Sequence, residues 1–163
     1  FIEILMAPSF TAEAKAHFTK KKNVRLLELP LRISDSGEKT LRSFHGGVLM
    51  QEEDEKLTPL SCYQTKTKKQ FSETQHHLIS FGILACKHLK SNGIALVGEH
   101  NDTITLVGAG MGQPNRLDSL HLLAAHRAKK KEAHFSELVL ISDAFFPFAD
   151  SIEAAHQYGI KFI

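Results

Sequence analysis

The fold is decided by residues 72–107, which read SETQHHLISFGILACKHLKSNGIALVGEHNDTITLV. A capping-box pattern at Ser72 begins a helix that we predict over 72–90, because the apolar residues that follow recur at helical spacing. Its apolar face is expected to pack on a sheet. Two short apolar runs, 93–97 and 103–107, then predict strands joined by a turn at Asn101-Asp102.

Shorter elements lie on both sides of this region. Apolar runs predict strands at 1–6, 24–29, 40–44, 48–51, 138–141 and 160–163. Helices are predicted from Thr11 to about residue 20, over 117–131, and over 149–158 with Gly159 as C-cap; a polar loop is expected over 30–39. Strands and helices alternate, so the expected fold class is layered α/β. The length of 163 residues suits one core, that is, a single domain over 1–163.

The composition excludes several classes of protein. Hydrophobic residues make up 42% and charged residues 23% of the chain, as in a folded globular protein. The net charge is +2 and the two lysine runs are far apart, so no nucleic-acid partner is expected. No stretch approaches the ~20 apolar residues of a membrane span. Cys62 and Cys86 lack zinc or disulfide spacing and fit a reducing cytoplasm. The start at Phe1 is expected of a piece of a longer protein.

Three stretches could carry chemistry. Residues 108–112 (GAGMG) lie between a predicted strand and helix, beside Arg116, and indicate either an anion site or a tight turn. Residues 142–150 (SDAFFPFAD) could stack a flat ring, or form a hydrophobic plug with Asp150 as a helix N-cap. Residues 90–93 (KSNG) are either a junction with emerging polar side chains or a simple helix cap. The histidines lack metal-ligand spacing, so solvated or packed rings are expected.

Five motifs carry a resemblance to a known family. They are ILMAP at 4–8, HGGVLMQ at 45–51, KSNGI at 90–94, GMGQPNR at 110–116 and SDAFFPF at 142–148. In order and spacing they resemble consecutive motifs of the AICAR formyltransferase/IMP cyclohydrolase family, and the last motif is the most specific.

The resemblance implies a fold and an activity. It implies a cytidine-deaminase-like α/β layering, with this chain as most of the second subdomain in the C-terminal part of the formyltransferase domain. The parent would be a cytoplasmic, homodimeric, bifunctional enzyme of purine biosynthesis, a transferase and a hydrolase, that passes a formyl group from the cosubstrate 10-formyltetrahydrofolate to the amine of AICAR. The zinc signature of the deaminases is missing, which argues against deamination.

The resemblance also implies roles for individual residues. Asn92 and Arg116 would contact nucleotide or folate. The folate pocket would be lined by Phe145, Pro147, Phe148 and Asp150. A structural potassium ion would be held by Ser91, Gly93 and Asp143. The chain departs from some relatives at Gly93, where they have serine, and at Ser151, where they have asparagine.

The catalytic pair of the family is not in this chain. It is a Lys-His dipeptide in a Lys-His-x-x-Pro-x-Gly setting, which the resemblance implies to lie upstream. Lys87-His88 repeats the dipeptide without the Pro or Gly, so we interpret it as a helix-end pair. The chain alone is therefore expected to be inactive. The alternative is a non-catalytic nucleotide-binding or assembly module with the same fold.

Overall fold

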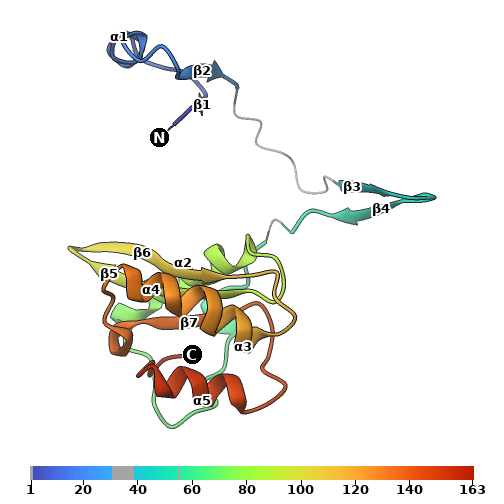
Figure 1. Cartoon of the computed structure of the whole chain (residues 1–163), viewed down its shortest axis with the longest axis vertical. Coiled ribbons are helices and arrows are strands. Elements are labelled where there is room, and N and C mark those ends of the chain that lie inside the picture. Colours follow the sequence, from blue (N-terminus) through green and yellow to red (C-terminus); the bar gives the residue numbers. More distant parts are fainter. Residues whose placement is uncertain (1, 31–38, 55) are drawn as a thin grey trace. The chain divides into compact units, whose positions relative to one another are not determined.

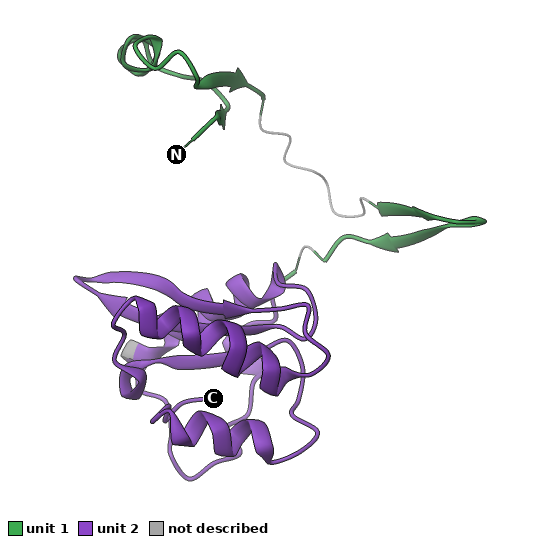
Figure 2. Cartoon of the chain, in the orientation of Figure 1, with its two compact units in different colours: residues 1–56 green, residues 57–163 purple. Residues whose placement is uncertain are grey.

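The computed structural model describes residues 2–30, 39–54 and 56–163 and divides the chain into two compact units. Unit 1 covers residues 1–56 and unit 2 covers residues 57–163 (Figures 1 and 2). The expectation of a single domain over 1–163 stays a prediction. The loop predicted over 30–39 lies almost wholly outside the described residues.

Unit 1 begins with a strand–helix–strand segment. Strands β1 (Ile4–Ala7) and β2 (Arg25–Glu28) pair in parallel and are connected through helix α1 (Ala12–Thr19). Thr11 caps the helix, because its side chain accepts a hydrogen bond of 3.2 Å from the backbone amide of Ala14. The predicted strand, cap and second strand are confirmed.

Unit 1 ends with a hairpin. Strands β3 (Lys39–Phe44) and β4 (Gly47–Glu52) pair antiparallel, as the sequence predicts. Gly46 stands in the turn at φ 87°, where a residue with a side chain would be strained. The large apolar residues of the hairpin are exposed, and among the described residues of unit 1 none is buried.

Unit 2 is built on a sheet of three strands in the order β6-β5-β7, with antiparallel neighbours. The strands are β5 (Ile94–His100), β6 (Thr103–Gly110) and β7 (Val139–Ser142). Asn101 and Asp102 form the predicted turn between β5 and β6 at φ 49° and 57°. Unit 2 also contains two short 3-10 helices, Leu60–Cys62 and Phe135–Glu137.

Helix α2 (Glu73–Lys87) covers one face of this sheet, and the capping box predicted at Ser72 and Gln75 is present. Leu78 packs there against Val97 and Val139. Gly82 allows the close approach, because a Cβ at this position would lie 2.5 Å from Ile141 Cγ1. The predicted helix and its packing on a sheet are confirmed.

The other face is covered by the remaining helices (Figure 1). A continuous helical segment runs through α3 (Arg116–Asp118), a π-helix (Ser119–Ala124) and α4 (Ala125–Lys130), and α5 (Asp150–Gln157) follows later. Their core with the sheet contains Ile94, Leu96, Leu120 and Leu140, none of them exposed. Unit 2 thus has three layers, and the α/β class is confirmed. The cytidine-deaminase-like layering stays a prediction.

Three details of the sequence-based prediction were wrong. Gly108 and Gly110 do not lie in a loop, because β6 continues through both of them. Residues 160–163 do not form a strand: Phe162 makes an isolated bridge to Val139. The C-cap of the last helix is Tyr158, one residue before the predicted Gly159; Gly159 follows it at φ 85°, and its amide donates to the His156 carbonyl.

Candidate functional site

One end of the sheet in unit 2 brings three of the motifs together. In the strand register, Ile94 at the start of β5 is paired with Gly110 at the end of β6 and with Ser142 at the end of β7. The junction before β5, the loop after β6 and the loop after β7 therefore meet at this edge. Residues far apart in the sequence become neighbours there because antiparallel strands bring opposite ends side by side.

The centre of the site is an ion pair between Arg116 and Asp143. Arg116 Nη2 lies 2.8 Å from Asp143 Oδ1, and Arg116 Nε donates a 3.1 Å hydrogen bond to Ser142 Oγ. The two side chains are only 15% and 19% exposed. Arg116 is therefore not a solvated surface charge, and its planar guanidinium binds two acceptors at once.

Asp143 is bound from a second side by the junction before β5. Ser91 Oγ donates a 2.7 Å hydrogen bond to Asp143 Oδ2, and the Asp143 amide donates to the Gly93 carbonyl at 3.2 Å. Burial alone raises the pKa of Asp143, but hydrogen bonds from Ser91 and the Gly93 backbone, together with Arg116, hold this pKa below its ordinary value of 3.8. The carboxylate is thus held in its charged form.

Asn92 links the junction to the loop after β6. Asn92 Nδ2 donates to the Gln113 carbonyl at 2.9 Å. The Gly112 amide donates at 3.1 Å to the carbonyl of Ser91, the residue before Asn92. Within the described residues Asn92 Oδ1 has no hydrogen-bond donor, so this oxygen can accept from a ligand. Because α2 ends at Lys87 with His88 as C-cap, the junction reading of residues 90–93 is correct and the simple-cap reading is wrong.

The glycine-rich stretch acts as close packing and a turn. A Cβ on Gly108 would lie 2.1 Å from the Ala124 carbonyl oxygen, and one on Gly110 would lie 2.0 Å from that of Ser119. The Gly112 amide, at φ 70°, already binds Ser91. The geometry therefore favours the tight turn over the anion site.

The three phenylalanine rings in the loop after β7 differ in how far they are exposed. Phe145 is 80% and Phe148 is 72% exposed, whereas Phe146 packs against the core. Pro147 and Asp150 are also exposed. The plug interpretation therefore holds only for Phe146. Asp150 is the first residue of α5 rather than its N-cap, which is Ala149, and its Oδ1 accepts from the Ser151 amide at 2.6 Å.

The residues expected for potassium do meet, and in this structure they bind one another. The Ser91 hydroxyl donates a hydrogen bond to Asp143, the Gly93 carbonyl accepts one from the Asp143 amide, and Arg116 supplies the neutralising positive charge. This arrangement fits an internal ion pair better than a cage for a cation, and potassium stays a prediction.

Sequence reasoning missed Ser119, which begins the π-helix. It is fully buried, and its Oγ donates a 2.6 Å hydrogen bond to the Asn92 carbonyl. The one signal in the sequence was a small polar residue at the start of an apolar helical face. Cys86, which lies beneath the site, is no nucleophile: burial raises its pKa to about 11, with Asp143 adding to the rise.

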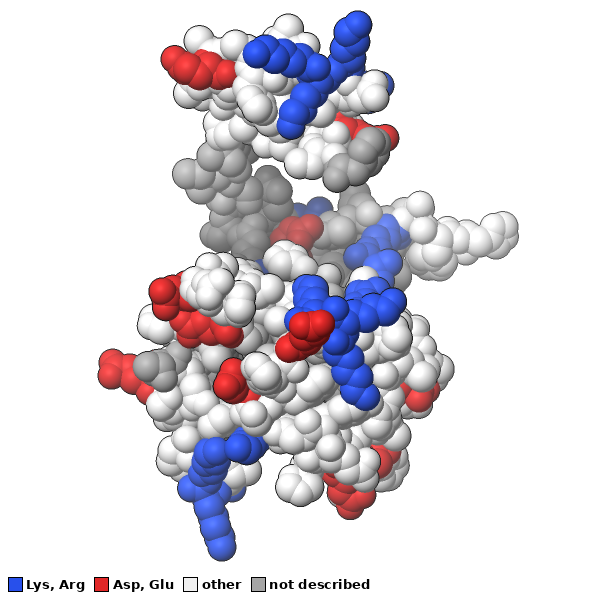
Figure 3. Space-filling view, turned by 60° about the vertical axis from the view of Figure 1, so that its left-hand side comes forward, with Lys and Arg blue, Asp and Glu red and all other residues white. Residues whose placement is uncertain are grey.

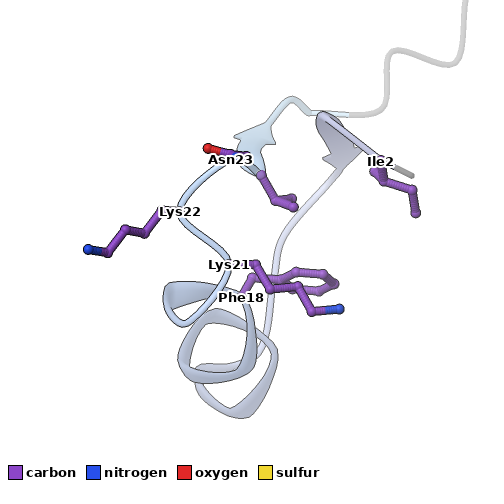
Figure 4. A pocket seen from close by; sticks show the side chains of 6 residues that line it. Ile2, Phe18, Lys21, Lys22 and Asn23 are labelled. Atoms are coloured by element: carbon purple, nitrogen blue, oxygen red, sulfur yellow. The ribbon is translucent and has the colours of Figure 1, made fainter.

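Two other surface features in the described part of the chain do not form a comparable polar cluster. A hollow of about 380 Å³ in unit 1 is lined by Phe18, Lys21 and Lys22 among others, but the two lysines point in different directions (Figure 4). On the face drawn in Figure 3, Lys and Arg side chains lie in separate groups with acidic side chains among them. No helix in the described part of the chain is long and apolar enough to cross a membrane.

Comparison with known proteins gives one family. The family model described as "AICARFT/IMPCHase bienzyme" matches residues 1–127. The chain is 44% identical over 164 residues to the bifunctional purine biosynthesis protein PurH of Limosilactobacillus reuteri, 39% over 163 residues to that of Oenococcus oeni and 40% over 165 residues to that of Enterococcus faecalis. Each match covers 100% of this chain and 31% of the relative, so the chain spans about a third of the length of these curated relatives.

Proposed function

Since the chain belongs to the AICARFT/IMPCHase bienzyme family, we propose that it forms part of the site that transfers a formyl group from 10-formyltetrahydrofolate to AICAR in purine biosynthesis. The relatives carry the name of a bifunctional purine biosynthesis protein. Of the two activities, we assign formyl transfer to this segment, in the C-terminal part of the parent.

The observation that supports this assignment is the convergence at one sheet edge. Three motifs that are separated by tens of residues meet through the pair of Arg116 with Asp143 and the contact of Asn92 with Gln113. Structural elements alone do not require such a concentration of partly buried polar groups, because each of them must find a partner to offset its desolvation. A ligand site accounts for it.

In the transfer, the bond between N10 of the folate and the formyl carbon breaks and a bond between that carbon and the AICAR amine nitrogen forms. One proton leaves the amine and one is gained by N10. The residues of this chain bind and orient the two substrates. Asn92 and Arg116 contact nucleotide or folate. Phe145, Pro147, Phe148 and Asp150 line the folate side, where an exposed ring offers a stacking surface.

The proton acceptor is supplied by another part of the parent. Lys87 is the last residue of α2 and His88 is its C-cap, as expected of a helix-end pair. General-base catalysis is typically worth ~10²- to 10⁴-fold in rate. The chain of 163 residues alone should therefore bind without turnover. The homodimer and the cytoplasmic location are part of the same proposal.

The test uses the full parent enzyme and its second activity as an internal control. Asn92→Ala and Arg116→Lys should each lower formyl transfer at least about tenfold, since each removes hydrogen bonds worth about 1–3 kcal/mol. Cyclohydrolase activity on formyl-AICAR, measured on the same samples, should stay within about twofold of the parent, because this proposal places it in a different part of the protein.

Loss of cyclohydrolase activity with intact formyl transfer would reverse the assignment of the two activities. Ligand binding without any turnover in the unmodified parent would instead support the non-catalytic module. Robust formyl transfer by the purified chain of 163 residues would contradict the placement of the catalytic pair upstream.

A further inference from the structure

We propose that Ser119 is a positioning residue of the formyl-transfer site, which fixes the Asn92 peptide so that the Asn92 side chain faces the ligand. This inference rests on the proposed function. Ser119 itself would touch neither substrate, and it would act through the carbonyl of Asn92.

The hydrogen bond of Ser119 is unusual for a serine in a helix. Such hydroxyls commonly donate to the carbonyl four residues earlier in the same helix. Here the Ser119 amide donates to the Asn115 carbonyl at 3.3 Å, while its hydroxyl donates at 2.6 Å to Asn92, 27 residues away. The hydroxyl therefore connects the π-helix to the junction before β5.

Ser119 is itself held firmly. It is fully buried, and its carbonyl lies so close to β6 that only glycine fits at position 110, where a Cβ would come within 2.0 Å of that oxygen. The neighbouring Leu120 is also fully buried, in the core between helix and sheet. A donor fixed on both sides can hold its acceptor in one orientation.

The Asn92 peptide, whose carbonyl accepts from Ser119, lies between two groups of candidate ligand contacts. On one side of the Asn92 carbonyl, the Asn92 side chain donates to Gln113 and presents Oδ1. On the other side, Gly93 accepts from the amide of Asp143, which pairs with Arg116. A shift of the Asn92 peptide would therefore move the candidate ligand contacts on both sides. Small displacements of this kind lower affinity and rate without unfolding the protein.

The experiment compares two variants of the full parent enzyme. Ser119→Ala removes the hydroxyl and should raise the KM for AICAR or for 10-formyltetrahydrofolate about tenfold. Leu120→Val is the matched control, because it removes one methylene from a fully buried neighbour in the same π-helix that is part of the hydrophobic core. It should lower the melting temperature and leave both KM values within about twofold of the parent.

Ser119→Cys adds a test of rescue, because the thiol is similar in size and a weaker donor. Its KM should lie between those of the parent and Ser119→Ala; if Ser119→Ala does not fold, a raised KM of Ser119→Cys supports the proposal. Parent-like KM values in both Ser119 variants, or equal effects of Ser119→Ala and Leu120→Val, would overturn it. If Asn92→Ala and Arg116→Lys also leave formyl transfer unchanged, the proposed function itself is wrong.

Discussion

At the scale of residues, the ion pair of Arg116 with Asp143 is the most consequential contact in unit 2. Its two members come from α3 and from the loop directly after β7, and little of either side chain reaches solvent. A pair in such a setting gains more from attraction than an exposed pair does, but breaking it leaves a charge without compensation. The pair should therefore affect stability as well as ligand binding.

The stability of the chain should depend on the charge of Asp143. Its pKa lies below 3.8 in the folded state, so its contribution is fully present above about that pH and is lost as the pH falls through the lower folded pKa. Asp143→Asn should lower the free energy of unfolding by about 1.5–3 kcal/mol at pH 7. Urea midpoints of both proteins, compared from pH 7 downward, should begin to approach one another only as the pH falls below about 3.8. A gap that widens toward low pH would contradict this sign.

The exposed ring of Phe145 should serve binding rather than folding. Because this residue is 80% exposed, Phe145→Ala should change the melting temperature little. In the parent it should raise the KM for folate about fivefold, since ring stacking is worth about 1 kcal/mol, with a smaller effect on AICAR. Asp150→Ala should likewise raise the KM for folate more than the KM for AICAR. Leu122→Ala, at a 61% exposed residue outside the site, is the control. Unchanged folate kinetics in both loop variants would refute the assignment.

At the scale of elements, the site depends on how closely the helical segment lies on β6. Gly108 and Gly110 meet the carbonyl groups of Ala124 and Ser119, so backbone packs directly on backbone. The π-helix begins at this contact, and π-helical turns are often found at functional sites. The glycines thus act through packing rather than through flexibility.

A methyl group at position 110 should push the π-helix away from the sheet. Gly110→Ala is expected to cost about 3 kcal/mol or more of unfolding free energy, because a backbone carbonyl cannot move aside. Gly98→Ala is the matched control in β5: its Cβ would meet the end of the Leu138 side chain, which can rotate, so about 1 kcal/mol is expected. Denaturant unfolding of the two variants measures the difference. Equal losses would show that the close approach is not what Gly110 provides.

At the scale of the whole molecule, the two units differ in what they bury. The buried apolar residues of the described chain all belong to unit 2, between Leu78 and Ile160. In unit 1, apolar residues of the hairpin such as Leu41, Leu49 and Met50 are more than 60% exposed. A single two-stranded hairpin is marginally stable at best in water. Unit 1 therefore needs a covering surface, whereas unit 2 has a core of its own.

The two units should behave differently when they are separated. Residues 57–163 should unfold cooperatively with heat and give a dispersed amide NMR spectrum, because both helical layers keep their sheet. Residues 1–56 alone should show little stable structure by circular dichroism. A cooperative transition in the isolated residues 1–56, or none in 57–163, would contradict this division.

The sequence by itself determined the local elements and the motifs. The helix Glu73–Lys87 with its capping box, the Asn101-Asp102 turn and the hairpin at Gly46 depend on residues within a few positions of one another. Periodicity and capping chemistry act over that range, so they could be predicted. The candidate residues of the site came from the resemblance of five motifs to a family, and their roles stay predictions.

Only the tertiary structure decided the strand order β6-β5-β7 and the contacts that follow from it. The pairing of Arg116 with Asp143, the hydrogen bond from Ser119 to Asn92 and the packing role of Gly110 join residues from different elements. Nothing local in the chain encodes such a contact, because it exists only once antiparallel pairing has brought the two strand ends to the same edge. Burial then selects a partner for each polar group, since leaving one unpaired in the core costs more than making the bond gains.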